Sequence, residues 1–156
     1  MPLFKRRTGD GEPGTPADPP SKSRVLSEPD ILDRLEEEIV RATRYGRPLV
    51  VVCAVPQRLP NQSLGQEEIA TAAEAIGVRL RFCDQIGALR DGTLVALLPE
   101  TDAASARVVA HRLAADLVVR SAGQERRNWR AGIAQVPEDG ADPPTVVRAA
   151  IARAAV

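Results

Sequence analysis

The sequence has few of the residue types on which catalytic and base-stacking sites depend. Aromatic residues make up 3% of its 156 residues, with one tryptophan and one tyrosine, so little material is available for stacking against nucleic-acid bases. The only histidine, His111, falls in a helical pattern with no cysteine, serine or acid constellation around it. We therefore expect His111 to be an ordinary surface residue rather than a general base.

Neither sign of charge is in excess, because Lys+Arg and Asp+Glu both count 21 and the formal net charge is zero. Bulk electrostatic attraction to nucleic acid or to an anionic membrane is therefore not indicated, and we expect neither as a partner. The sequence also lacks an apolar run long enough to span a bilayer, and its N-terminus lacks the apolar region of a secretory signal. We expect a cytoplasmic protein. Cys53 and Cys83 lie inside apolar segments, which predicts two buried, reduced thiols.

The N-terminal residues differ in composition from the rest of the chain. Residues 1–27 are rich in glycine, proline and polar residues, and such a segment cannot bury enough apolar surface to offset its ordering entropy. We predict a disordered arm over residues 1–27 and a single folded domain over residues 28–156, which is long enough for a real core.

Residues 84–100 are the stretch around which the domain is organised. Two short apolar runs flank Asp91-Gly92, a pair that predicts a tight, exposed hairpin turn with both residues at positive φ. The second run, residues 94–98, is apolar at every position, as is the earlier run at residues 49–55. Both runs therefore predict strands that are covered on both faces, near the middle of a sheet.

Helical periodicity fills the rest of the domain. We predict helices that begin after Ser27 and end at Gly46, that span residues 67–81, that begin at a Thr101 cap, and that begin at Asp142-Pro143. A further strand is predicted at residues 128–136. After the leading helix the order is β-α-β-β-α-β-α, which indicates an α+β fold of palm or ferredoxin-like type. In it, helices cover one face of an antiparallel sheet.

Four pieces of the sequence carry a resemblance to a known family. They are residues 35–49, residues 95–102, Ala110-His-Arg-Leu113 and residues 132–140, and they cover most of the predicted domain in the family's order. With these pieces the chain resembles the GGDEF domain of diguanylate cyclases, which make cyclic di-GMP from two GTP. The resemblance implies a GGDEF-type fold and a bacterial-type signalling role.

The catalytic positions of that family do not match. The five motif positions fall on residues 90–94, where the metal-binding acid of the third position is replaced by Gly92 and the acid of the fourth by Thr93. The metal-binding aspartates of the family's first strand fall on Val55 and Gln57. Mg²⁺ on a triphosphate needs oxygen ligands, usually carboxylates, and residues 49–66 contain none. The one nearby acid, Asp91, is typical of a turn. We therefore expect a degenerate domain that is not an enzyme, with no catalytic residue, metal or cofactor.

One functional element of the family is retained. Arg81-Phe-Cys-Asp84 matches the Arg-x-x-Asp of the product-inhibition site, and Arg112 falls on the position of its second arginine. The resemblance implies that Arg81, Asp84 and Arg112 bind cyclic di-GMP, since guanidinium groups pair with phosphate and a carboxylate accepts from guanine N–H groups. The alternative is a local ion pair between Arg81 and Asp84.

A second role stays open beside the receptor: a protein-interaction or dimerisation module that binds no nucleotide. Its partner would be a second copy of the chain or another protein. The apolar stripe of the leading helix, residues 31–45, would supply that surface, or it packs on its own domain. Residues 126–130, Arg-Arg-Asn-Trp-Arg, either contact phosphates or form a strand edge that arginines keep soluble, with Trp129 partly buried.

Overall fold

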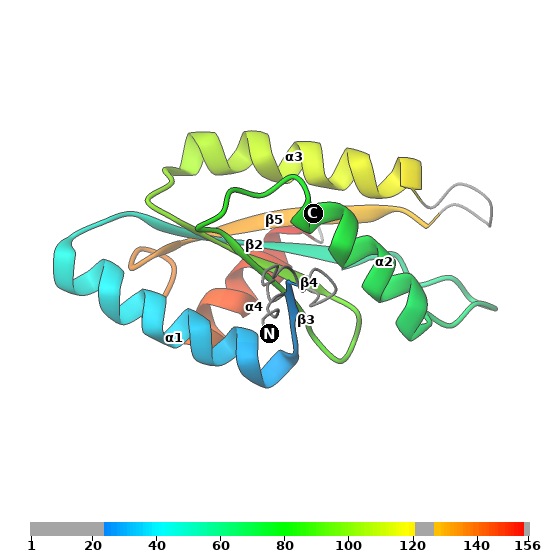
Figure 1. Ribbon diagram of the computed structural model, residues 1–156, viewed down its shortest axis with the longest axis horizontal. Coiled ribbons are helices and arrows are strands. Elements are labelled where there is room, and N and C mark those ends of the chain that lie inside the picture. The colour runs from blue at the N-terminus through cyan, green and yellow to red at the C-terminus, as the bar shows by residue number, and fades with distance from the viewer. Residues whose placement is uncertain (1–23, 121–126, 155–156) are drawn as a thin grey trace, which may run out of the picture.

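The sheet is the frame on which the other elements lie (Figure 1). The computed structural model describes residues 24–120 and 127–154, and residues 1–23, with most of the predicted arm, lie outside it. Within the described residues five strands form one sheet in the order β1-β3-β4-β2-β5. The elements are β1 (Val25–Leu26), α1 (Glu28–Tyr45), β2 (Leu49–Pro56), α2 (Gln66–Gly77), β3 (Gln85–Ala88), β4 (Leu94–Pro99), α3 (Ala103–Arg120), β5 (Trp129–Val136) and α4 (Pro143–Ala154). The predicted α+β order is confirmed.

The strand pairing is antiparallel except at one edge. β2 pairs antiparallel with both β4 and β5, and β3 pairs antiparallel with β4. β1 pairs parallel with β3, with Val25 opposite Ile86. Val25 and Leu26, which fall in the predicted arm, are therefore part of the sheet. A two-residue strand carries no periodicity of its own, so only its contact with β3 reveals it.

Helices cover both faces of the sheet, so the prediction of helices on one face is wrong. α2 and α3 lie on one face, and α1 and α4 lie on the other (Figure 1). Alternate residues of β2 enter the two cores: Val50 and Val52 face α2 and α3, whereas Val51 and Cys53 face α1 and α4. A strand that is apolar at every position needs cover on both sides, which is what the second pair of helices provides.

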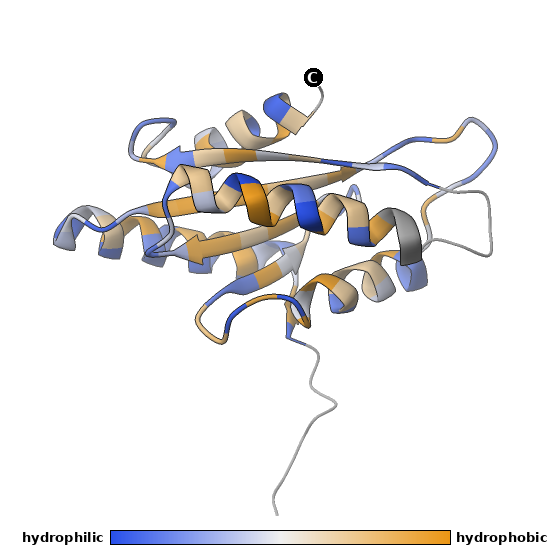
Figure 2. Cartoon of the chain, turned by 90° about the horizontal axis from the view of Figure 1, so that it is seen from above, coloured by the Kyte–Doolittle hydropathy of each residue, from blue (hydrophilic) through white to orange (hydrophobic). Residues whose placement is uncertain are grey.

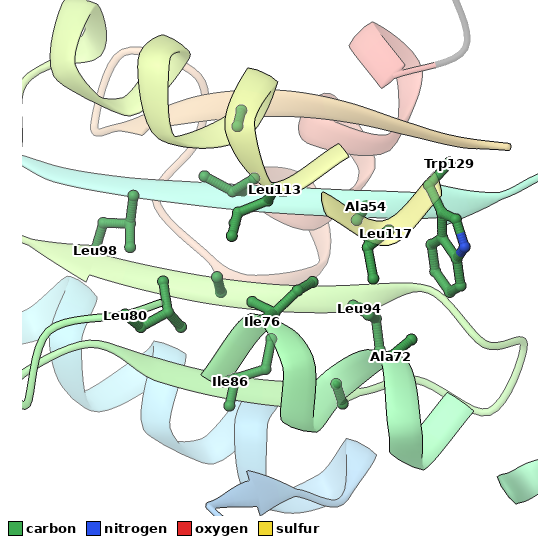
Figure 3. Close-up of a cluster of buried hydrophobic side chains, with 14 of the residues drawn as sticks. Ala54, Ala72, Ile76, Leu80, Ile86, Leu94, Leu98, Leu113, Leu117 and Trp129 are labelled. Carbon is green, nitrogen blue, oxygen red and sulfur yellow. The ribbon is translucent and has the colours of Figure 1, made fainter. Parts of the chain in front are cut away.

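Figure 3 shows the first of these cores, in which Ile76 from α2, Leu113 and Leu117 from α3, and Leu94 and Leu98 from β4 converge. The outer faces of the helices are more polar than the strands beneath them (Figure 2). In the described residues no helix has the length and apolar character needed to cross a membrane.

The leading helix α1 packs on its own domain. Ser27 caps it, with its side chain accepting a hydrogen bond from the N–H of Asp30 at 3.3 Å, and Gly46, at φ 61°, ends it. Its apolar stripe is buried in the second core: Ile31, Leu35, Ile39 and Ala42. The stripe is therefore not free to pair with another copy of the chain.

Two helix ends differ from the prediction. α2 ends at Gly77, and residues 78–84 form a loop that leads into β3. α3 is capped by Asp102 and not by Thr101, because Asp102 Oδ1 accepts from the N–H of Ser105 at 2.8 Å. Cys83 lies in this loop and is exposed, so the prediction of a buried thiol is wrong there. Cys53 is buried as predicted, and burial together with nearby Asp91 raises its thiol pKa to about 12.

Candidate functional site

The β3–β4 hairpin ends in the three-residue loop Arg90-Asp91-Gly92. The N–H of Leu89 donates to the carbonyl of Thr93 at 2.8 Å, and the N–H of Gly92 donates to the carbonyl of Leu89 at 3.0 Å. Gly92 has φ 92°, and Asp91 is not at positive φ, so the predicted pair of positive-φ residues is wrong. A three-residue loop whose last residue takes positive φ needs only one glycine. Arg90 and Asp91 are exposed as predicted, whereas Gly92 is buried.

The link between β2 and α2 covers this hairpin tip. A Cβ on Gly92 would lie 2.1 Å from Leu64 Cδ2, and Arg58 Nη2 donates to the carbonyl of Asp91 at 3.1 Å. Asp91 is itself held in the turn, since its Oδ1 accepts from the N–H of Thr93 at 2.9 Å. Among the described residues no group of three His, Cys, Asp or Glu side chains comes together in a way that would hold a metal ion.

The family's first-strand metal positions lie at the same end of the sheet. Gln57 donates its N–H to the carbonyl of Asn128 at 2.8 Å and accepts Arg127 Nη1 on its own carbonyl at 2.7 Å. Arg127 is 2% exposed and also binds Glu68, with Nε 2.6 Å from Oε1. This partly buried pair was not predicted, because the two residues are 59 positions apart.

The stretch at residues 126–130 forms the start of an edge strand. β5 pairs with β2 alone, and Trp129 is buried rather than partly buried. Arg126 lies outside the described residues, and Arg127 faces inward, so the predicted solubilising role does not hold for Arg127.

The loop between α2 and β3 holds Arg81 and Asp84 together. Asp84 is 4% exposed; its Oδ1 accepts from Arg81 Nη2 at 3.0 Å, and its Oδ2 accepts from the backbone N–H of Arg81 at 2.9 Å. The local ion pair that the sequence left open is therefore present. The hydrogen bond that the Arg81 side chain donates to Asp84 is the main cause that raises the pKa of Arg81.

Arg81 also ties this loop to the start of α3. Its Nη2 donates to the carbonyl of Pro99 at 2.9 Å and to the hydroxyl of Thr101 at 2.7 Å. The Arg81 side chain nevertheless stays 54% exposed. It can therefore hold the loop and still face a ligand.

Arg24, just before β1, binds the same loop from the other side. Its guanidinium donates to the carbonyl of Gly77 at 3.0 Å, of Arg81 at 3.1 Å and of Asp84 at 3.0 Å. The first of these carbonyls belongs to the last residue of α2 and the other two to the loop that follows it, where the helical hydrogen-bond pattern ends. Sequence reasoning missed Arg24 because it lay in the predicted arm, and no local pattern points to it.

Arg112 lies on the exposed side of α3, and no hydrogen bond or ion pair of Arg112 is found in the part of the chain that the structure describes. One helical turn further on, Asp116 Oδ2 lies 3.3 Å from Arg79 Nε, an ion pair without a well-directed hydrogen bond. This contact places the start of the 78–84 loop beside the C-terminal half of α3. The structure thus brings Arg81 and Asp84 into contact and leaves Arg112 separate from them on the neighbouring helix.

Two apolar side chains in this loop face solvent. Phe82, between Arg81 and Asp84, is 99% exposed, and Val78 is 80% exposed. Large apolar side chains in the open beside a charged pair are a feature of surfaces that meet a ligand or another protein.

Comparison with models of known protein families and with curated proteins found no match. Solved structures do resemble the chain. The GGDEF domain of YfiN (TpbB) from Pseudomonas aeruginosa is 21% identical with a TM-score of 0.70, over 82% of this chain and 86% of that domain. Diguanylate cyclase SiaD of the same organism, solved with its activator SiaC, is 22% identical with a TM-score of 0.71, over 84% of this chain and 54% of SiaD.

A further similar structure contains a bound nucleotide. The coiled coil and GGDEF domain of DgcB from Caulobacter crescentus, solved with cyclic di-GMP, is 12% identical with a TM-score of 0.64. That match covers 85% of this chain and 74% of the solved one. Identities of this size establish the fold, and the described chain has the fold of GGDEF domains.

Proposed function

We propose that the chain is a catalytically inactive GGDEF-like signalling domain that binds cyclic di-GMP through Arg81, Asp84 and Arg112. The carrying observation is the Arg81–Asp84 pair: a buried carboxylate held by a guanidinium that stays half exposed. Such a pair is already in place before a ligand arrives, so little ordering entropy is lost on binding. The ligand is carried over from the resemblance and from the DgcB complex.

The hairpin tip supports the absence of catalysis. The family's two acid positions hold Gly92, which has no side chain, and Thr93, whose side chain carries a hydroxyl and no carboxylate. Leu64 fills the space beside Gly92. Two carboxylates reach the tip: Asp91 bonds within its own turn, and Glu28 Oε2 accepts from the N–H of Arg90 at 2.6 Å. Both are engaged with backbone N–H groups of the loop, which makes them a poor ligand set for Mg²⁺ on a triphosphate.

A protein-interaction module without nucleotide is the second candidate. The observation that favours it is the exposure of Phe82 and Val78 on the same loop. Aromatic side chains are enriched at the centres of protein interfaces. In this second reading the Arg81–Asp84 pair serves only to hold the loop.

Calorimetric titration with cyclic di-GMP tests the receptor. We expect native protein to bind, and Arg112→Gln to weaken binding by about tenfold or more, because a lost charged hydrogen bond costs roughly 1.5–3 kcal/mol. Arg112→Gln is the sharper variant, since Arg112 has no bond within the described fold to lose. Arg81→Ala should also lose most of the affinity, but it removes the contacts to Pro99 and Thr101 as well.

The matched control is Arg148→Gln on α4, another exposed arginine, which should bind as native protein does. Asp91→Ala should likewise leave the affinity unchanged. Absence of heat and of a thermal shift in native protein at high ligand concentration would end the receptor proposal. Loss of binding in Asp91→Ala would instead place the ligand at the hairpin tip.

A further inference from the structure

A groove of about 660 Å³ runs along the outer edge of β5, at the opposite edge of the sheet from β1. β5 lies between α3 and α4, which form the two walls (Figure 1). α3 contributes Arg107, His111 and Ala114, and α4 contributes Arg153. A volume of this size lies within the range of about 300–1,000 Å³ typical of small-ligand sites. None of the residues in the Arg81 loop lines it.

The backbone edge of β5 is already bonded in its second half. In an antiparallel strand, alternate residues point their N–H and C=O groups away from the neighbour. Gln57 bonds to Asn128, so even-numbered residues face β2 and odd-numbered ones face the groove. The carbonyl of Ile133 accepts from Arg153 Nη1 at 2.9 Å, and the N–H of Gln135 donates to Asp139 Oδ2 at 2.7 Å.

From residue 131 to residue 135, both outward groups of Ala131 and the N–H of Ile133 have no partner among the described residues, whereas the carbonyl of Ile133 and both groups of Gln135 are bonded. The row of free groups therefore stops at Ile133, which limits strand addition at this edge, because strand addition relies on a row of main-chain bonds. Charged side chains that occupy an edge in this way are a usual protection against strand pairing. The groove is therefore suited to a small molecule rather than to an extended peptide.

The charge of the groove is positive. Arg153 is balanced by Asp139, with Nη2 2.7 Å from Oδ1 and Nη1 2.7 Å from Oδ2. On the facing wall, Arg107 and His111 are exposed, and neither has a hydrogen bond or ion pair within the described chain. They are four positions apart on α3, so their side chains lie one above the other and can reach the same group. A cation without a partner, beside an outward N–H, favours an anion.

We propose that this groove binds a small phosphate-bearing ligand, with Arg107 and His111 pairing with the phosphate and the edge of Ala131 contacting the rest. The neighbouring side chains at Ala110, Ala114 and Ala131 are small, which leaves room for an organic group next to the phosphate. The Arg153–Asp139 pair closes the end of the groove at Gln135.

The full chain titrated with pyrophosphate tests this site. His111 is the only histidine, so its ring signals in a ¹H–¹³C correlation spectrum report on the groove without ambiguity. We expect a saturable shift of these signals that sodium chloride at equal ionic strength does not reproduce. Arg107→Gln should weaken binding by about tenfold, the effect of about 1.4 kcal/mol lost from a charged hydrogen bond.

Arg148→Gln, an exposed arginine of α4 outside the groove, should bind pyrophosphate as native protein does. GMP in a parallel titration tells the two sources of phosphate apart: tighter binding than pyrophosphate indicates a nucleotide site, and equal binding indicates a site for the phosphate alone. A shift that fails to saturate, or equal affinity in Arg107→Gln and native protein, would overturn the proposal. A glutamate-rich peptide that binds where pyrophosphate does not would also overturn it and would make the edge a strand-docking site.

Discussion

At the scale of single residues, Asp139 shows how one carboxylate can hold the end of a strand. It accepts from the N–H of Gln135 and from both terminal nitrogens of Arg153, so it joins β5 to the C-terminal part of α4. The hydrogen bonds from Arg153, and then that from Gln135, lower the pKa of Asp139 to about 2. Folding thus favours the charged form of the Asp139 carboxyl group.

This pKa predicts a pH dependence of stability. A carboxyl group whose pKa is lower in the folded state stabilises the fold. This stabilisation is complete at pH values above the pKa of the unfolded state, and it is lost as the pH falls toward the pKa of the folded state. Between about pH 4 and pH 2, the free energy of unfolding of native protein should therefore fall by about 1 kcal/mol more than that of Asp139→Asn. This value is reduced for solvent screening, because the Arg153 side chain is half exposed. Urea unfolding at a series of pH values measures this difference.

The control is Asp33→Asn on the exposed side of α1, which should follow native protein. Parallel curves for native protein and Asp139→Asn through the whole acid range would show that the Asp139–Arg153 pair contributes nothing to folding.

At the scale of elements, the contact between α4 and β5 depends on one missing side chain. A Cβ on Gly132 would lie 2.2 Å from the carbonyl oxygen of Ala150 and 2.5 Å from the nitrogen of Ala154. Both are backbone atoms of α4, so a rotamer change cannot relieve the clash. The helix must move away from the sheet if residue 132 gains a methyl group.

Gly132→Ala should therefore destabilise the domain by about 3 kcal/mol or more, beyond the ordinary range for overpacking. Gly77→Ala is the matched control: its Cβ would meet Ile86 at 3.7 Å, an ordinary contact, and alanine gains up to about 1 kcal/mol over glycine in a helix. Denaturant unfolding of both variants gives the comparison. Equal effects would mean that α4 can shift without cost.

The elements also show what the sequence can and cannot predict. Continuous apolar runs correctly predicted β2 and β4 as central strands, because burial at every position leaves a local signature. The same apolar runs implied that both faces of the sheet are covered, and the prediction of helices on one face alone was inconsistent with that. Ser27, Gly46 and Asp142 were correctly placed at helix ends, since capping depends on neighbouring residues alone.

Features that depend on distant contacts were not predictable. β1 exists only through its pairing with β3, and Arg24 binds carbonyls 53 to 60 positions away. Arg81 and Asp84 were found because they are neighbours in sequence and match a known motif. The groove beside β5 was not found, because α3, β5 and α4 each supply part of it.

At the scale of the whole molecule, the fold carries two separate surfaces on opposite edges of one sheet. The loop of residues 78–84, which holds Arg81, adjoins the β1–β3 edge, and the groove proposed to bind phosphate runs along β5. The hairpin tip, which forms the catalytic centre in the family that the sequence resembles, belongs to neither. Binding at either surface therefore requires no catalysis at the tip.

The last prediction concerns that tip. Purified protein incubated with GTP and Mg²⁺ or Mn²⁺ should form no cyclic di-GMP above a no-protein control, as measured by chromatography. The physical reason is the ligand set: a metal-bound triphosphate needs carboxylates at the ends of β2 and β3–β4, where Val55, Gln57 and Thr93 stand instead. Mg-GTP should also leave the melting temperature unchanged, since a ligand at 100 times its dissociation constant would stabilise the fold by about 2.7 kcal/mol. Turnover that Asp91→Ala abolishes would contradict the prediction and would identify Asp91 as a metal ligand despite its bond to Thr93.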